Sequence, residues 1–165
     1  TAWTVNITTG ITKPTIGSAD EPRMDLNSVN VSNGAGTLTI TFSETDFEVP
    51  PVAEWNTAIG GTTDGTVSLA SYYDNGNTAL AKTTPISSLG PFNPVSFSDD
   101  VGSGLLAVST PFSLTLEAII THTGAQQISS FNSELSPVPE PGTVILFGIG
   151  LIGLAGIARK KFIKK

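Results

Sequence analysis

The side chains that could carry out chemistry are few and scattered. His122 is the only histidine and the chain has no cysteine, so a zinc site would need carboxylates for every other ligand. No Gly-x-Ser-x-Gly elbow accompanies His122, and we interpret it as a structural residue near a strand end. Glu117 lies in the strand with the clearest alternation, is expected to point outward, and has no evident acid partner for glycoside chemistry. We therefore predict no catalytic residues and no enzyme.

Two segments contain oxygen atoms of the kind that calcium binds, Asp74-Asn75-Gly76-Asn77 and Asp99-Asp100. Calcium accepts carboxylate and carbonyl oxygens in flexible geometries. Neither segment matches a complete calcium-binding loop, and turns rich in Asp and Asn usually form for backbone reasons. We interpret both as turns and predict no cofactor, with calcium as the weaker alternative.

Three aromatic residues are candidates for stacking against a sugar: Trp55, Tyr72 and Tyr73. Successive residues of a strand point to opposite faces, so at most one of the two tyrosines is exposed there. Aromatic side chains of small sandwiches are more often part of the core. We favour the core interpretation and keep glycan contact as the alternative.

The elements that would position these residues are short strands. Alternation of apolar and polar residues predicts them through the first 135 residues, with turn signals between them and no sustained helical period. The pattern favours a single all-β domain, a β-sandwich or jelly roll, over any α/β arrangement. The expected elements are a strand at 1–12, a hairpin over 24–43, a strand at 67–73 with a hairpin partner at 79–82, a loop at 85–94, weaker strands at 95–98 and 105–109, a strong strand at 111–123 and a last strand at 127–135.

The charge distribution separates the body from the end of the chain. Five of the eight basic residues lie in the last seven positions, which leaves three basic residues against all 14 acidic residues in the rest. Nucleic-acid binding requires clustered Lys and Arg on one surface, so this class of partner is excluded. The first residues show no secretory signal, which we interpret as numbering that begins after a removed signal peptide.

The composition changes at Ser136. Residues 136–142 contain three prolines and form an expected linker, and residues 143–165 form an expected apolar helix with a basic end. The apolar run from Val144 to Ala158 spans about 22 Å as a helix, against a hydrocarbon core of about 30 Å. Basic residues at its end can reach the headgroups. The residues expected to contact the membrane or neighbouring helices are Val144, Leu146, Phe147, Gly150, Gly153 and Gly156, and those of the basic end are Arg159, Lys160 and Lys161.

This tail resembles the PEP-CTERM sorting signal of Gram-negative bacteria. The resemblance rests on Pro139-Glu140-Pro141, the Gly-rich apolar run and the basic cluster that follows it. It implies export, recognition of Pro139, Glu140 and Pro141 by a membrane enzyme called an exosortase, and an association with exopolysaccharide or biofilm. The basic end is mostly lysine and is interrupted by Phe162-Ile163, where the family often has an arginine run.

Two functions remain open for the body. The first is a non-enzymatic structural protein of the cell surface or extracellular matrix, a homo-oligomer or filament subunit, in which residues 1–12 could be donated to a neighbour as a strand. The second is a polysaccharide-binding module associated with exopolysaccharide. Both place the protein outside the cell, on its outer surface or in the extracellular space.

Overall fold

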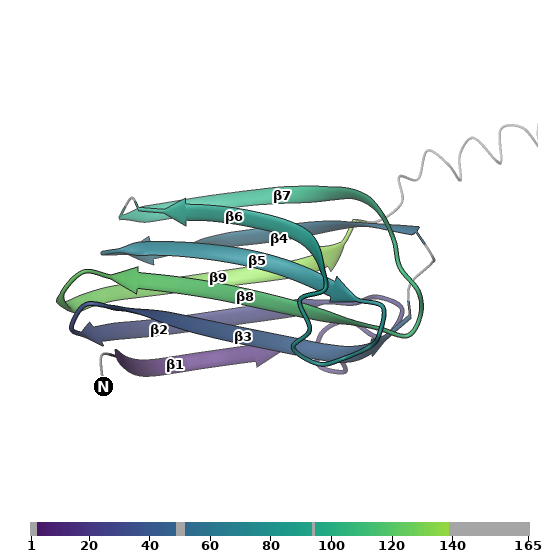
Figure 1. Cartoon of the computed structure of the whole chain (residues 1–165), viewed down its shortest axis with the longest axis horizontal. Helices are drawn as coiled ribbons and strands as arrows, with labels where there is room; N and C mark the ends of the chain where they lie inside the picture. The colour runs from purple at the N-terminus through teal and green to yellow at the C-terminus, as the bar shows by residue number, and fades with distance from the viewer. Residues whose placement is uncertain (1–2, 49–51, 94, 139–165) are drawn as a thin grey trace, which may run out of the picture.

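The body consists of two antiparallel β-sheets packed face to face (Figure 1). The computed structural model describes residues 3–48, 52–93 and 95–138, and these contain no helix. None of the described residues therefore belongs to a helix long and apolar enough to span a membrane. The strands are β1 Trp3–Ile11, β2 Met24–Asn33, β3 Gly36–Phe47, β4 Val52–Thr63, β5 Thr66–Asp74, β6 Thr84–Phe92, β7 Ser96–Ala107, β8 Phe112–His122 and β9 Ala125–Pro137.

The strand order is that of a jelly roll with one added strand. One sheet has the order β1-β2-β9-β4-β7 and the other β3-β8-β5-β6. From β2 onward the chain changes sheet at every connection except that between β5 and β6. Eight strands wound in this way form a double Greek key, and β1 extends the first sheet by pairing with β2. The all-β sandwich predicted from the alternation is confirmed.

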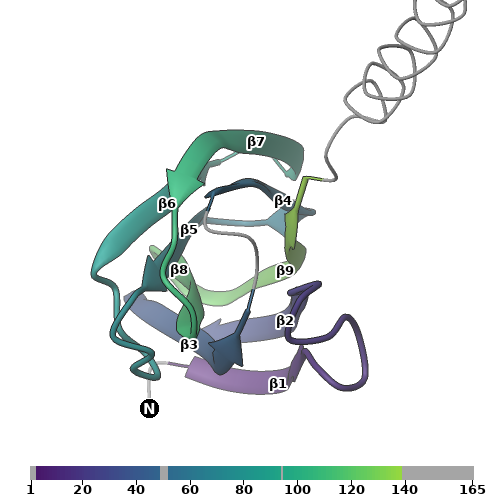
Figure 2. The same ribbon diagram turned by 90° about the vertical axis from the view of Figure 1, so that its right-hand side faces the viewer.

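The two long sides of the sandwich differ. On one side β6 and β7 lie next to each other and bring the sheets together (Figure 2). On the other side lie β1 and β3, the end strands of their sheets. A Cβ atom on Gly10 of β1 would lie 2.7 Å from the Phe42 ring of β3, so glycine allows this close approach. Apart from this approach, β1 and β3 make fewer contacts with each other than β6 and β7 do, and we refer to their side as the open side of the sandwich.

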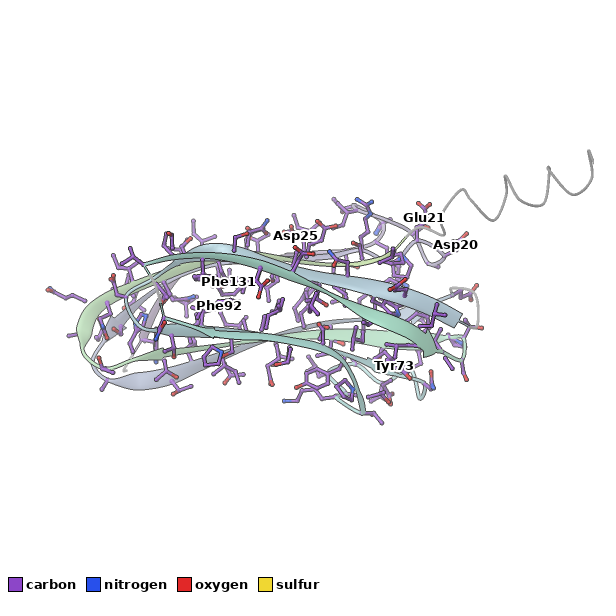
Figure 3. The ribbon with its side chains drawn as sticks, turned by 90° about the horizontal axis from the view of Figure 1, so that it is seen from above. Asp20, Glu21, Asp25, Tyr73, Phe92 and Phe131 are labelled. Carbon is purple, nitrogen blue, oxygen red and sulfur yellow. The ribbon has the colours of Figure 1, made fainter. Side chains whose placement is uncertain are left out.

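Alternating apolar residues of both sheets build the core. Phe112, Leu114 and Leu116 of β8 are fully buried, as is Trp55 of β4, whose ring meets Phe112 edge to face at 6.0 Å. In Figure 3, Phe131 lies between the two layers whereas Asp25 lies on the outer side of one of them. Burial of such aromatic side chains provides much of the stability of a small sandwich.

Hydroxyl groups also join the sheets through the interior. Thr57 of β4 and Ser71 and Ser87 of the opposite sheet form a triangle with oxygen–oxygen distances of 2.9, 2.7 and 2.6 Å. Thr57 and Ser71 are completely buried. Each hydroxyl can donate one hydrogen bond and accept others, so the triangle satisfies polar groups that would otherwise be costly to bury.

A connection between β5 and β6 covers part of the outer face of β8. Lys82 of this connection forms an ion pair with Glu117, and the carbonyl of Thr78 accepts a hydrogen bond of 2.8 Å from Ser113. Glu117 was expected to be outward-facing, and it is, but the connection leaves it only 9% exposed. The covering segment does not pair as a strand, so the predicted hairpin partner at 79–82 is wrong.

The remaining strand predictions are partly confirmed. Strands at 1–12, 67–73, 111–123 and 127–135 are confirmed. The hairpin over 24–43 is wrong, because β2 and β3 lie in opposite sheets. The expected loop at 85–94 is largely the strand β6. The weak strands at 95–98 and 105–109 overlap the two ends of one longer strand, β7, which runs from Ser96 to Ala107. The sequence analysis assigned no strand to the stretch that forms β4.

Replacing Trp55 tests its position in the core. The substitution Trp55→Ala should lower the free energy of unfolding by about 3–5 kcal/mol, because it removes a buried ring and leaves a cavity. Urea denaturation of the full chain in mild detergent measures this loss. The control Leu80→Ala, at a side chain that is 58% exposed, should change the free energy by less than about 0.5 kcal/mol. Equal effects of the two substitutions would contradict the proposed packing.

Candidate binding face

The outer face of the five-stranded sheet brings polar residues from four strands into register. In one row Asp25 of β2 lies opposite Glu134 of β9, Glu134 opposite Ala58 of β4, and Ala58 opposite Asp100 of β7. These four residues share the outward direction, because Leu26, Ile59 and Leu135 next to them along the strands are buried. The row therefore places three carboxyl groups on one face.

The adjacent row has the same arrangement with uncharged groups. Asn27 lies opposite Asn132, Asn132 opposite Gly60, and Gly60 opposite Ser98. Because β4 contributes only small residues to both rows, the side chains of β9 and β7 stand higher than the floor between them. We refer to the resulting hollow over β4 as the β4 groove.

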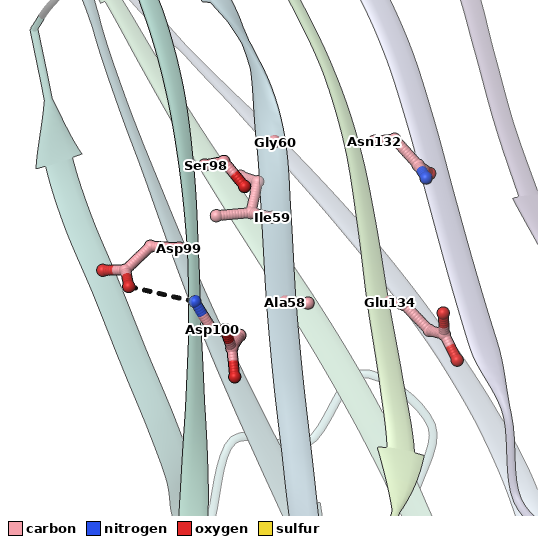
Figure 4. A pocket seen from close by; sticks show the side chains of 8 residues that line it. All are labelled: Ala58, Ile59, Gly60, Ser98, Asp99, Asp100, Asn132 and Glu134. Atoms are coloured by element: carbon pink, nitrogen blue, oxygen red, sulfur yellow. Dashed lines mark hydrogen bonds between the residues drawn. The ribbon is translucent and has the colours of Figure 1, made fainter.

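The β4 groove has a volume of about 260 Å³ (Figure 4). Adjacent strands lie about 4.8 Å apart, so the backbones of β9 and β7, on either side of β4, are separated by about 10 Å. The groove is lined by Ala58, Ile59, Gly60, Ser98, Asp99, Asp100, Asn132 and Glu134.

Next to the β9 wall of the groove, the carboxyl group of Asp25 on β2 lies opposite that of Glu134. Partial burial raises the pKa of the Asp25 carboxyl, and the negative charge of Glu134 across the strand pair raises it further. Asn27 donates a hydrogen bond from its side-chain amide to Asp25 Oδ1. Like charges directly opposite each other in a strand pair are destabilising, so this pair imposes a cost on the isolated body.

The groove presents hydrogen-bond acceptors on both of its walls. No group of three or more His, Cys, Asp or Glu residues among the described residues could hold a metal. Ionised carboxylates accept hydrogen bonds only, whereas the amide of Asn132 and the hydroxyl of Ser98 can also donate. This combination suits a ligand with many hydroxyl groups, or with ammonium groups, and disfavours an anionic one.

A second zone of the same face is aliphatic. It consists of Ile7 on β1, Val29 and Val31 on β2, and Ile128 on β9, which we call the aliphatic strip. The register places Ile7 opposite Val29 and Val31 opposite Ile128. Ile7 is 64% exposed and Ile128 48% exposed, with the two valines half-buried between them. Contiguous exposed apolar residues of this kind commonly mark an interaction surface.

The residues considered for glycan contact do not form a surface platform. Trp55 is fully buried against Phe112, and Tyr73 is 7% exposed with its hydroxyl donating to the carbonyl of Ala107 at 3.1 Å. Tyr72 points to the opposite side of β5 and is half-buried. The prediction that these aromatic residues belong to the core is confirmed for Trp55 and Tyr73. The alternative of a glycan-stacking platform that includes Trp55 is wrong, because Trp55 is buried.

The loop considered for calcium is occupied by its own hydrogen bonds. The Asp74 carboxylate accepts from the Thr83 hydroxyl at 2.7 Å and from the backbone N–H of Thr78 at 3.0 Å. These bonds lower the pKa of Asp74, with that from Thr83 the larger cause. In the second segment, Asp99 accepts from the backbone N–H of Asp100 at 3.0 Å. The first arrangement is that of a turn-stabilising residue. Asp99 and Asp100 lie within strand β7, so the interpretation of this second segment as a turn is wrong.

His122 is buried at the end of β8. Its Nε2 lies 2.7 Å from the Ser129 hydroxyl, and the indole of Trp3 covers its ring at 4.5 Å between centroids. Burial lowers the pKa of His122, while the charge of Asp64 acts in the opposite direction. The neutral imidazole therefore holds Trp3, and with it the start of β1, on the sandwich.

The sorting residues lie outside the described part of the chain. This applies to Pro139, Glu140 and Pro141, to the expected helix positions from Val144 to Gly156, and to the basic end. What the structure does describe is their point of attachment. Strand β9 continues to Pro137, and the next residue donates its backbone N–H to the carbonyl of Glu54 at 2.7 Å.

Neither the β4 groove nor the aliphatic strip was predicted from the sequence. The groove went unrecognised because β4 was not identified as a strand, although Trp55, Thr57 and Ile59 alternate there with small and polar residues. That alternation was the available signal. The aliphatic strip combines three strands, and no pattern within one of them indicates which residues of the others are its neighbours.

Comparison with known proteins identifies the tail. Residues 137–160 match the model of the PEP-CTERM protein-sorting motif, which confirms the resemblance, and no curated protein matches the chain. Several solved structures match the chain at low identity and low TM-score. One is a structure from work on the promiscuous specificity of carbohydrate-binding modules of the β-sandwich superfamily. It matches at 10% identity and a TM-score of 0.42, and the match covers 80% of this chain and 54% of that chain.

Two further structures match to a similar degree. The module TmCBM61 in complex with β-1,4-galactotriose has 8% identity and a TM-score of 0.42, with coverage of 82% of this chain and 88% of that chain. A protein of infectious bursal disease virus, Gx strain, has 17% identity and a TM-score of 0.42, with 84% and 33% covered. This chain thus spans about half of the first structure and a third of the viral one.

Neutralising Asp25 tests the electrostatics of the face. Because its pKa is raised in the folded protein, ionising Asp25 costs folding free energy, and this cost appears as the pH rises through the unfolded pKa to the folded pKa. The substitution Asp25→Asn should therefore stabilise the full chain at pH 7, by roughly 0.2–1 kcal/mol, and have a smaller effect at pH 3. Urea denaturation at both pH values measures the difference. A destabilised variant at pH 7, or an equal gain from Asp20→Asn in an exposed loop, would contradict this account.

Proposed function

We propose that this chain, which carries a PEP-CTERM sorting motif at residues 137–160, is an exported, non-enzymatic structural protein of the cell surface. The motif implies processing by an exosortase and anchoring at the membrane through the tail. The structural role of the body rests on the way in which the body and the tail are joined.

The observation that carries the proposal is the position of the motif relative to β9. The motif begins at Pro137, which is also the last residue of β9. Strand β9 lies inside its sheet, with β2 on one side and β4 on the other. Its final residues remain paired, since Ser136 lies opposite Asn56 and Pro137 opposite Trp55. No loose segment therefore separates the folded body from the start of the sorting motif.

A connection of this kind suits a protein that bears load. Hydrogen bonds between antiparallel strands run perpendicular to the strands. A pull on the tail along β9 consequently acts on many of these bonds at once, on both of its edges. An end strand would present bonds to one neighbour only. The body is attached through a strand that is held on both edges, as suits a surface structure.

The sorting step can be tested on the producing cells. Replacing the element with Pro139→Ala and Glu140→Ala should leave the chain unprocessed at its full mass and reduce its display on the surface more than tenfold. Intact mass of the membrane fraction and immunogold labelling of cells measure the two effects, with Thr39→Ala on the outer face of β3 as the control. Normal processing of the variant would contradict the sorting role, and an unchanged cell surface in cells without the protein would contradict the structural role.

Polysaccharide binding is a second candidate function, and the β4 groove favours it. The groove has a floor of small residues and walls that accept hydrogen bonds. Its carboxylates disfavour polyuronates and favour neutral or amino-sugar polymers. A surface protein with such a groove would hold the matrix to the cell.

Gly60 offers a clean way to block the groove. A Cβ at this position would meet its nearest neighbour, the carbonyl of Phe97, at 3.6 Å, which is an ordinary contact. The substitution Gly60→Leu should therefore fold normally and lower the affinity for chitosan or galactan oligosaccharides at least tenfold. Isothermal titration of the full chain in detergent measures this, with Gly34→Leu, at a turn with open space around it, as the matched control. Equal binding by both variants, or no binding by the unmodified chain, would rule out the groove as a sugar site.

A further inference from the structure

The four end strands of the two sheets differ in how they are protected against pairing with another chain. Free strand edges carry unpaired backbone groups, and charged residues or prolines normally protect them. Strand β7 carries Asp99 and Asp100, and β6 carries Pro85 and Pro91. The nine residues of β1 include no charge and no proline. Among the described strands, β1 pairs only with β2.

Strand β3 borders the same open side but is less suited to accept a partner. Its second half carries Glu44 and Asp46, and the Lys13 ammonium donates to the carbonyls of Thr45 and Asp46 there. Its first half presents exposed threonines on the outer face of the sheet. A strand added to β3 would thus cover polar side chains, whereas one added to β1 would extend the sheet that carries the aliphatic strip.

We propose that a second copy of this chain pairs with β1, antiparallel, to form a two-fold dimer with a continuous ten-stranded sheet. This inference rests on the proposed structural function and names its partner. A two-fold contact brings each residue of one copy near the same region of the other, so it tolerates only an uncharged strip in a body as acidic as this one. The same contact through β7 would place Asp99 and Asp100 against their own copies.

The regular part of β1 fixes the register. A bulge interrupts the pairing with β2 between Val5 and Ile7, and the ladder is regular from Ile7 to Ile11. Centring the two-fold axis on Thr9, the middle of this stretch, places Thr9 against its own copy and Ile7 against Ile11 of the second copy. Cross-strand pairs between threonines and between β-branched residues are favourable. The pairing also extends each aliphatic strip by one apolar residue, because Ile7 of one copy meets Ile11 of the other.

The direction of the strands determines where the tails of the dimer lie. Both β1 and β9 run antiparallel to β2, so β1 runs in the direction that leads to Val138 at the end of β9. Antiparallel pairing of the two β1 strands therefore places the two Val138 residues at opposite ends of the dimer. Two upright molecules in the same flat membrane cannot adopt this arrangement. It fits molecules on facing surfaces, or molecules released from the membrane, and it makes the contact a bridge between surfaces.

Single cysteines can test this pairing, because the chain has none of its own. The variant Thr9→Cys in the full chain in detergent should form a covalent dimer with a short bismaleimide within minutes, since the two thiols face each other. Ser96→Cys, which is also exposed and lies on the β7 edge, should crosslink at least tenfold more slowly. Similar rates for both variants would overturn the proposal, because they would reflect collisions or association through the tail.

A charge on the edge provides a second readout. Adding Ile7→Lys to Thr9→Cys should slow the crosslinking at least tenfold and convert the dimer to a monomer in analytical ultracentrifugation, whereas Ser96→Lys should change neither. Circular dichroism verifies that both lysine variants are folded. A folded Ile7→Lys variant that still crosslinks would overturn the pairing. Surface display is measured separately. A protein without the edge lysine that is displayed normally but forms no dimer contradicts this inference and leaves the structural function standing.

Discussion

The pairing of β9 on both of its edges is the constraint on which the rest of the molecule depends. This strand bonds to β2 and β4, contributes Phe131 and Leu135 to the core, and ends where the sorting motif begins. One strand therefore closes the jelly roll and connects it to the tail. Because its inward residues are buried against the opposite sheet, the strand cannot slip along its neighbours without exposing them. The same strand therefore connects the body to the sorting tail and stabilises its fold.

The two faces of the five-stranded sheet are used differently. Its inner face is filled by large side chains and by hydroxyl groups that bond across to the other sheet. Its outer face has small residues on β4, carboxylates on both sides of them, and aliphatic residues toward β1. The raised pKa of Asp25 shows that its ionised form is disfavoured in the folded body. This charge and the exposed apolar area of the aliphatic strip both lower the stability of the isolated body. Such costs are expected where a surface is shaped for a partner rather than for the monomer.

Local pattern in the sequence was enough for part of this account. The alternation of strands such as 111–123, the absence of helical periods and the three-part tail depend on neighbouring residues, and they predicted the sandwich and the sorting motif. The hairpin over 24–43 failed because turn signals report a reversal of direction and not whether the chain changes sheet. Strand β6 contains two prolines, and because of them this segment was predicted to be a loop. Prolines are nevertheless tolerated in a strand at the edge of a sheet. The groove and the strip depend on register between distant strands, which no single segment encodes.

Amide hydrogen exchange of the full chain at low and high protein concentration tests the central claim most directly. The claim is that β9 holds the body to the tail while the free edge of β1 joins two copies. The account predicts that β9 amides exchange most slowly at both concentrations. It also predicts that the β1 amides pointing away from β2 exchange rapidly when dilute and become protected when concentrated. Exchange in β1 that is independent of concentration, or β9 amides as fast as those of the end strands, would contradict it.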